Sequence, residues 1–232
     1  MTLRIDTVPD LDRPGIGAVF ASTWNVHTPE RQDAAVAAIT KTWESRPWPE
    51  DGPVSYSVFK GTDGASLLHL SQWRELSDYD AFVAAHRAER NSEIDDAVPG
   101  IERLRLDKYA PYRGTSRDPG RVPGAFVTVE VEFDGPDPDR QRAWIDAVFE
   151  ALGSDPAPHP GGISGHFHTG FDGTRVLNFA QWASVQDHID ALAAPGDGIG
   201  SPTPEWQRVQ SFPGVVGGGV RRWLPGVSLS GG

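Results

Sequence analysis

The sequence predicts an α+β protein in which one β-α-β-β-α-β unit occurs twice. Two observations lead to this prediction. The chain matches itself without a gap from Pro14 onward at an offset of 109 residues, the separation of Pro14 and Pro123. Within each copy, apolar residues alternate in some segments and recur at helical spacing in others. A chain of 232 residues is long enough to form two small hydrophobic cores, so the duplication indicates two domains.

The clearest repeated stretch is an apolar strand that ends in Gln-Trp and leads through a turn into a helix. It runs from Leu67 to Tyr79 and again from Val176 to His188. Side chains four positions apart on a strand share a face, so a polar residue and a tryptophan project together in each copy. The pairs are His69 with Trp73 and Asn178 with Trp182. We interpret these pairs as the best candidates for a functional site.

The first domain, residues 14–112, is predicted to contain four strands and two helices. Thr28 has the side chain of a helix N-cap and precedes a proline at the first helical position. The turn Gly61-Thr62-Asp63-Gly64 supplies the positive φ that a tight hairpin needs. The strands are expected at Ile16 to Asn25, Val54 to Lys60, Ala65 to Trp73 and Ile101 to Tyr109, and the second helix at Ser77 to Arg90.

The second domain, residues 123–224, is predicted to repeat this order. Asp137 is the expected N-cap of a helix that carries Trp144, Val148 and Leu152 at helical spacing. The strands are expected at Ala125 to Phe133, Ile163 to Thr169, Arg175 to Trp182 and Val215 to Trp223, and the second helix at about Ser184 to Ala194. The repeat then loses register, which predicts an inserted Gly- and Pro-rich loop from Pro195 to Pro204.

The remaining segments are short. Residues 1–13 form an N-terminal extension that adds an edge strand or lies on the surface, residues 113–122 have the polar composition of a linker, and residues 225–232 are expected to form a loose tail. The β-α-β-β-α-β order defines the ferredoxin-like unit. Helices cover one face of such a sheet and leave the other apolar, so we expect two tandem ferredoxin-like domains packed sheet to sheet. We expect the faces with Trp73 and Trp182 to look toward the helices, with a pocket between the layers.

Composition excludes several classes of protein. The formal charge of -11 and the lack of a Lys/Arg cluster argue against nucleic acid as a partner. Without cysteine the chain has neither disulfides nor thiolate ligands. The start of the chain has no continuous apolar run, and no stretch approaches the roughly 20 apolar residues of a membrane span. The expectation is a soluble cytoplasmic protein that does not bind a membrane.

The two Gln-Trp strands, each followed by a turn into a helix, resemble the antibiotic biosynthesis monooxygenase family of dimeric α+β barrels. The resemblance covers both halves of the chain and implies an intramolecular version of that barrel. It also implies a cofactor-independent oxygenase that acts on a polyketide-derived anthrone with dioxygen.

The family's pocket is described by an Asn, a Trp four residues later, a Tyr six further on and an Arg from the following segment. The second half matches at Asn178 and Trp182 and has His188 at the Tyr position; the first half matches at Trp73 and Tyr79 and has His69 at the Asn position. No arginine stands at the family's place. The nearest basic candidates for substrate binding are Arg87, Arg90 and Arg208.

These residues suit chemistry through an enolate. An anthrone or phenol that loses a proton can pass an electron to dioxygen without flavin or metal, if the protein orients it and donates hydrogen bonds to the charged oxygen. Asn178 and Trp182 can donate, and His69 or His188 can donate or accept a proton. Glu130 lies on a strand expected to be central, where it acts as a base of raised pKa, contacts substrate or pairs with an arginine.

Two other functions stay open from the sequence: a polyketide cyclase or isomerase that uses the same enolate, and a small-molecule binder without catalysis. His166 and His168 share a strand face, but two histidines are too few for a metal site, so no metal or other cofactor is predicted. Haem is a minority alternative, because His86 is not spaced as a proximal ligand. The sequence leaves further self-association open.

Overall fold

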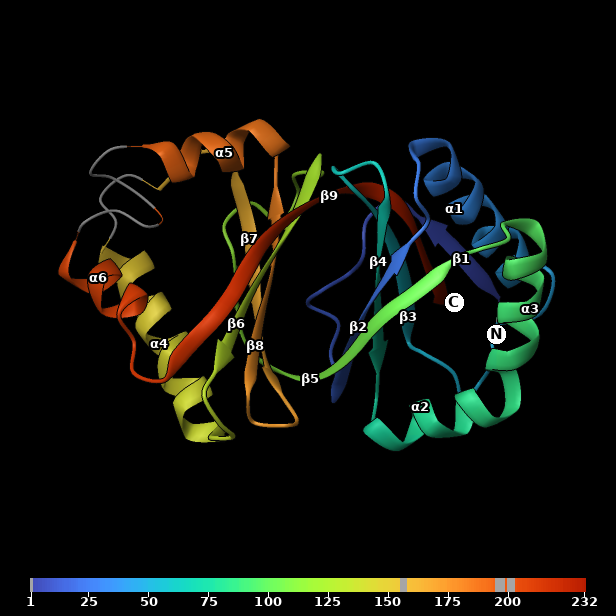
Figure 1. Cartoon of the computed structure of the whole chain (residues 1–232), viewed down its shortest axis with the longest axis horizontal. Helices are drawn as coiled ribbons and strands as arrows, with labels where there is room; N and C mark the ends of the chain where they lie inside the picture. Colours follow the sequence, from blue (N-terminus) through green and yellow to red (C-terminus); the bar gives the residue numbers. More distant parts are fainter. Residues whose placement is uncertain (1, 155–157, 195–198, 200–202) are drawn as a thin grey trace. The chain divides into compact units, whose positions relative to one another are not determined.

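The computed structural model describes residues 2–154, 158–194, 199 and 203–232 (Figure 1). The chain divides into two compact units. Unit 1 consists of Met1–Lys108 with Trp223–Gly232, and unit 2 consists of Tyr109–Arg222. Each unit combines helices with a β-sheet, so the predicted α+β class is confirmed. The predicted packing of one sheet against another stays a prediction.

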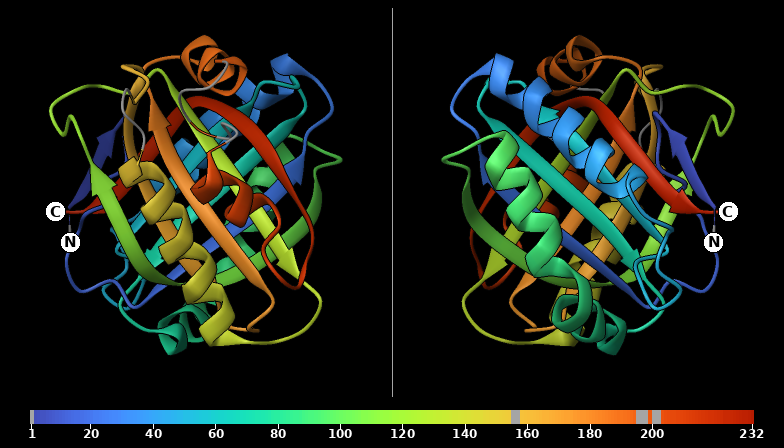
Figure 2. Two further views of the ribbon diagram at one scale, coloured as in Figure 1. Left: turned by 90° about the vertical axis from the view of Figure 1, so that its left-hand side faces the viewer. Right: turned by 90° about the vertical axis from the view of Figure 1, so that its right-hand side faces the viewer.

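Unit 1 has the predicted β-α-β-β-α-β order. Its elements are β2 (Ala18–Asn25), α1 (Pro29–Glu44), β3 (Ser55–Gly61), β4 (Ser66–Trp73), the helical run α2 (Leu76–Phe82), η1 (Val83–Arg87) and α3 (Ala88–Ala97), and the first part of β5 (Glu102–Ser116). The sheet order β3-β4-β2-β5 follows from this connectivity. Figure 2 shows α1 and α3 lying across one face of this sheet.

Unit 2 repeats the order with different helix lengths. Its elements are β6 (Ala125–Phe133), α4 (Pro138–Ser154), β7 (Gly162–Gly170), β8 (Arg175–Trp182), α5 (Val185–Ala193), α6 (Pro204–Gln210) and the first part of β9 (Val215–Gly231). The sheet runs β7-β8-β6 and continues to β9. Most of the inserted loop predicted at Pro195 to Pro204 lies outside the described residues, and the helix α6 that follows it was not predicted.

The caps and hairpins are as predicted. Thr28 accepts a hydrogen bond from the N-H of Arg31, and Asp137 accepts one from the N-H of Arg140. Gly64 and Gly173 adopt φ values of 72° and 75° in the two hairpin turns, where glycine tolerates a positive φ. Local sequence therefore determines where these helices begin and where these strands reverse.

The last strand of each repeat continues beyond its predicted end. Both strands run on past a proline, Pro111 in β5 and Pro225 in β9, although proline has no N-H for the ladder. The register shifts between Pro111 and Arg113 against β7, and between Val58 and Phe59 opposite Pro225. These bulges let pairing resume after each proline. Residues 113–116, predicted as linker, are thus part of β5.

The predicted loose tail is wrong. The end of β9 pairs with β3 in unit 1, and Val227 and Leu229 are buried in the core of that unit. The N-terminal extension supplies an edge strand, β1 (Leu3–Asp6), which pairs with the same part of β9. Alternating apolar residues after a Pro-Gly pair form a strand here because β3 offers an unpaired edge. None of the helices in the described part of the chain is long and apolar enough to cross a membrane.

A buried glutamine attaches the first helix of each unit to the hairpin. The side-chain amide of Gln32 donates to the carbonyls of Gly61 and Ser66, at 3.0 and 2.8 Å. Gln141 donates to Gly170 and Arg175, at 3.2 and 2.6 Å. In each unit the two carbonyls lie at the base of a hairpin turn, and one of them, that of Gly61 or Gly170, also accepts the N-H of Gly64 or Gly173 within the turn. This contact explains why both repeats have a glutamine at this position, Gln32 in the first and Gln141 in the second.

We expect Gln32→Ala or Gln141→Ala to destabilise the fold by about 2 kcal/mol, because each removes two hydrogen bonds from a buried amide. Urea unfolding followed by circular dichroism measures the change. The control is Gln186→Ala, since Gln186 is exposed and, among the described residues, its side chain donates to Asp190 on the same helix. Equal stability of the Gln32 and Gln186 variants would contradict this role.

Candidate functional site

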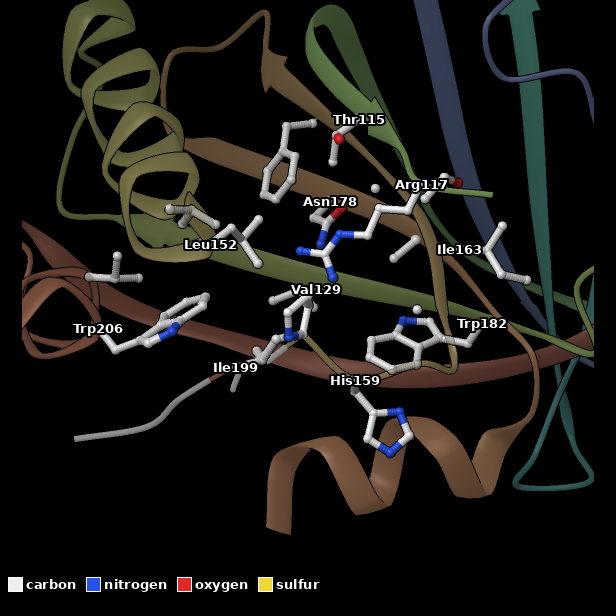
Figure 3. A pocket seen from close by; sticks show the side chains of 18 of the residues that line it. Thr115, Arg117, Val129, Leu152, His159, Ile163, Asn178, Trp182, Ile199 and Trp206 are labelled. Atoms are coloured by element: carbon white, nitrogen blue, oxygen red, sulfur yellow. The ribbon is translucent and has the colours of Figure 1, made fainter. Parts of the chain in front are cut away.

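A cavity of about 260 Å³ lies in unit 2 between the sheet and the helices α4 and α6. Its walls are mainly apolar. The strands contribute Val129, Ile163, Gly165, Phe167, Asn178, Ala180 and Trp182, and the helices contribute Trp144, Val148, Leu152, Trp206, Val209 and Gln210. Asn178 and Trp182 therefore lie on the helix-facing side of β8, as the strand alternation predicted, and both border the cavity (Figure 3).

Asn178 is the most distinctive polar group of this cavity. Its Oδ1 atom is buried and has no hydrogen-bond partner among the described residues. Buried polar atoms are nearly always paired, so this one needs an explanation. Gly165 on β7 lies opposite Ala180, diagonally across from Asn178, and a Cβ added there would lie 3.5 Å from this oxygen. The absence of a side chain at Gly165 leaves room for a ligand beside Asn178.

Three further polar groups border the same cavity, and the sequence did not assign them to a site. The indole Nε1 of Trp206 is buried and unpartnered among the described residues. His159 accepts a hydrogen bond at Nδ1 from the N-H of Gly161, so its neutral ring carries hydrogen at Nε2. The side chain of Arg117 extends into the cavity toward Asn178 (Figure 3). Arg117 belongs to the predicted linker and Trp206 to the unpredicted helix α6, so no strand or helix pattern singled them out.

His188 does not border the cavity. It is buried on α5 beside Trp182, with the rings T-shaped and their centroids 4.9 Å apart. The Arg222 Nε-H donates to His188 Nδ1 at 3.0 Å, which places the hydrogen of the neutral ring on Nε2. Burial, with the nearby Arg222 charge, lowers the pKa of His188 to about 4. In this structure His188 is a neutral support for Trp182.

Glu130 and Arg208 also lie away from the cavity. Val129 borders it, so Glu130, the next residue on β6, points to the opposite face of the sheet. Arg208 is on the exposed side of α6, where its Nη1 lies 2.6 Å from Glu150. On a helix only some residues face inward, and in α6 these are Trp206, Val209 and Gln210. The substrate-binding roles predicted for Glu130 and Arg208 have no support from their positions.

Unit 1 has a smaller cavity of about 100 Å³ in the same place between sheet and helices. It brings together the residues predicted for that half: His69, Trp73, Tyr79, Arg87 and Arg90. Three larger side chains fill space that is open in unit 2. Tyr56 stands where unit 2 has Gly165, Phe20 where it has Val129, and Trp43 where it has Leu152.

The first-half histidine is held in a hydrogen-bonded pair. The Tyr56 hydroxyl lies 2.6 Å from His69 Nδ1, and the Trp24 ring lies 4.0 Å from the His69 ring. Burial, with the nearby Arg103 charge, lowers the pKa of His69 to about 3. Burial also raises the pKa of Tyr56 above its usual value. Both groups are therefore neutral near pH 7, which makes His69 a poor source of protons there.

The glutamine of each Gln-Trp pair has a structural contact on the opposite strand face. Ser55 Oγ donates to Gln72 Oε1 at 2.6 Å, and Ser164 Oγ donates to Gln181 Oε1 at 2.9 Å. These pairs bind neighbouring strands of the hairpin together. The repeated glutamine thus belongs to the scaffold, whereas the residues that differ between the repeats line the cavities.

Neither cavity suits a haem. Pockets for drug-sized molecules usually measure about 300–1,000 Å³, and a haem is larger than such molecules. The unit 2 cavity is smaller than this range and has one histidine in its lining, His159, which sits on a loop. His86 is absent from the residues that border the unit 1 cavity.

Comparisons with known proteins agree on the fold. Neither protein-family models nor curated protein sequences match the chain. A solved structure of an anthrone oxidase-like protein superposes with a TM-score of 0.67 at 19% identity, covering 97% of this chain and 95% of the other. A candidate monooxygenase from Lactobacillus acidophilus NCFM gives 0.59 at 11% identity, covering 93% and 97%. Chlorite dismutase from Candidatus Nitrospira defluvii gives 0.52 at 14% identity, covering 91% and 92%.

These identities are low, so the likeness is one of fold alone. The chain shares the fold of several oxidoreductase-related proteins over nearly the whole of its length and theirs. The fold does not define an activity, so activity has to be inferred from the residues that line the cavities.

We expect His69→Asn, which copies the residue of unit 2, to weaken the pH dependence of stability. The folded pKa of about 3 is below the ordinary value of 6.5, so the unfolded chain binds one more proton between these values and stability falls as pH falls. One such proton corresponds to about 1.4 kcal/mol per pH unit. Urea unfolding of both proteins at pH 5, 6 and 8 measures the slopes. Identical slopes from pH 5 to 6 would show that His69 is not a buried neutral group.

Proposed function

We propose that unit 2 is a cofactor-independent oxygenase that converts an anthrone or related phenol to a quinone with dioxygen. The observation that carries this proposal is the apolar cavity lined by both Asn178 and Trp206, whose side-chain oxygen and indole N-H are buried and have no hydrogen-bond partner among the described residues. Such a cavity suits a flat aromatic molecule that has a hydroxyl group to donate and a carbonyl group to accept.

The reaction balances without a further reagent. The methylene carbon of the anthrone loses a proton to solvent and leaves an enolate, which passes one electron to dioxygen. The substrate radical and superoxide combine into a peroxide anion at that carbon, which takes up a proton from solvent. The resulting hydroperoxide loses water as the second C-H bond breaks and the O-O bond cleaves. The products are the quinone carbonyl and one water molecule. The protein has to orient the substrate, exclude bulk water and stabilise the enolate oxygen.

Each polar group of the cavity has a distinct part in this scheme. The Arg117 guanidinium is the cation closest to Asn178 in Figure 3 and balances the negative charge of the enolate. Asn178 accepts a hydrogen bond from a ring hydroxyl, which fixes the orientation of the substrate. The Nε2-H of His159 donates to the oxygen on which charge develops. Trp182 and Trp206 provide flat walls, and their N-H groups are additional donors.

The lining also favours the oxygenase over the cyclase or isomerase. Moving protons between substrate carbons requires a positioned base and acid. The lining residues of the unit 2 cavity include no carboxylate, and the neutral His159 already uses Nδ1 as an acceptor. Electron transfer to dioxygen requires less of the protein, since the enolate itself is the reductant. The anthrone oxidase-like protein of similar fold adds support for this substrate class.

The test is oxygen uptake with anthrone in a flavin-free and metal-chelated buffer, together with the absorbance of the quinone. We expect Gly165→Tyr to abolish uptake, because it introduces into the unit 2 cavity the large side chain that unit 1 has at the equivalent position, Tyr56. Gly165→Ala is the matched control and should keep most activity, since its Cβ makes only ordinary contacts of 3.5 and 3.6 Å. If the Tyr variant is folded and as active as the Ala variant, the cavity is not the site.

Two further substitutions separate orientation from charge. Asn178→Ala should lower kcat about a hundredfold if its hydrogen bond positions the reacting substrate. Arg117→Gln should lower kcat with little change in KM, because the enolate charge appears only as the reaction proceeds. Initial rates over a range of anthrone concentrations measure both parameters. If anthrone binds but the unsubstituted protein consumes no oxygen, the unit is a binding module and not an oxygenase.

A further inference from the structure

Arg90 is a buried cation whose side chain forms no ion pair with the described residues. It is 4% exposed, and its guanidinium carbon lies 4.7 Å from the ring centre of Trp43 and 5.4 Å from that of Phe82. Its Nη1 donates to a backbone carbonyl, but its Nε is buried and unpartnered among the described residues. The nearby Glu89 and Glu93 both pair with Arg46 instead. A buried charge is costly unless it is paired, and Arg90 is one of the residues that line the unit 1 cavity.

A second arginine enters the same cavity because the helix changes its winding. The π-helical turn η1 inserts one extra residue between α2 and α3, so Arg87, five residues after Phe82, faces the sheet. A continuous α-helix would turn His86 to that face. The Nη1 of Arg87 donates to the Tyr79 hydroxyl at 3.0 Å, and no ion pair of the described residues involves Arg87. The winding of the helix thus adds a second cation.

The other polar groups of this cavity add no negative charge. Its lining includes no carboxylate. His69 is buried and neutral, and its Nε2 has no partner among the described residues. Ser71 accepts the indole N-H of Trp73 at 2.8 Å, which leaves the hydroxyl hydrogen of Ser71 available to donate. The cavity therefore combines two cations with neutral donors in a space of about 100 Å³.

We infer that the unit 1 cavity is a second ligand site, which binds a short-chain carboxylate between Arg87 and Arg90. A guanidinium pair matches the two oxygens of a carboxylate, and the rings of Trp43, Trp73 and Phe82 provide an apolar surface for a short alkyl group. The volume limits the alkyl group to a few carbons, because benzene occupies an engineered cavity of about 150 Å³. This site is separate from the proposed oxygenase cavity in location, residues and ligand.

The test uses sodium propionate, with propionamide as the uncharged molecule of the same shape. Indole N-H signals of Trp43 and Trp73 in ¹H-¹⁵N spectra report on binding. We expect saturable shifts with propionate, at a Kd on the order of 1 mM, and at least tenfold weaker binding of propionamide. Equal affinity for the two molecules, or no saturable shift with propionate, would overturn the inference.

Substitutions locate the binding within unit 1. Arg90→Met and Arg87→Gln should each weaken propionate binding about tenfold or more. Arg90→Met should keep or raise the melting temperature, because it replaces a buried charge with an apolar chain of similar length. Arg87 is half-buried, so its variant tests the site even if the Arg90 variant does not fold.

Arg117→Gln in unit 2 is the matched control and should leave propionate affinity unchanged. Loss of binding in this control, or retained binding in both unit 1 variants, would assign the shifts to another site and contradict the inference. Anthrone oxidation plays no part in these measurements. Propionate binding therefore tests the unit 1 site even if unit 2 does not oxidise anthrone. Anthrone oxidation likewise tests unit 2 even if propionate does not bind.

Discussion

The contact on which both units depend is the buried glutamine amide that joins the first helix to the hairpin. Gln32 and Gln141 each donate two hydrogen bonds to carbonyls at the base of a hairpin turn. With the N-cap just before it, this contact fixes where the helix starts relative to the strands. The distance between helix layer and sheet then follows from the side chains between them, and that distance creates the space for a cavity.

On this common scaffold, a few substitutions produce two different cavities. Tyr56, Phe20 and Trp43 fill in unit 1 the space that Gly165, Val129 and Leu152 leave open in unit 2. The larger cavity is apolar and has isolated hydrogen-bonding groups, which suits an aromatic substrate. The smaller cavity has two arginines and suits an anion. The residues that differ between the two units thus give the two cavities different sizes and different polar groups.

Burial controls the charges at both sites. The pKa values of His69 and His188 are lowered to about 3 and 4, so these histidines are neutral near pH 7 and act through their shape and hydrogen bonds. The positive charges in the two cavities come from Arg87, Arg90 and Arg117. An arginine keeps its charge when it is buried, whereas a histidine loses it, and this difference determines which residues can stabilise an anion.

Much of the architecture could be predicted from the sequence because it depends on local patterns. The helix caps Thr28 and Asp137, the hairpin turns at Gly64 and Gly173, and the shared face of Asn178 and Trp182 all follow from residue type and spacing. These features involve neighbours along the chain. Their physical causes are therefore visible in short segments.

The rest required the tertiary structure, because it depends on which strands and helices meet. The strand after Pro225 exists because β3 has a free edge, and Arg87 faces its cavity because of a π-helical turn without a sequence signal that we could read. Arg117 and Trp206 come from segments without periodicity and border the cavity only after folding. The repeated order of strands and helices and the shared face of Asn178 and Trp182 could thus be read from the residues alone. Long-range packing decided the size, charge and remaining residues of each cavity.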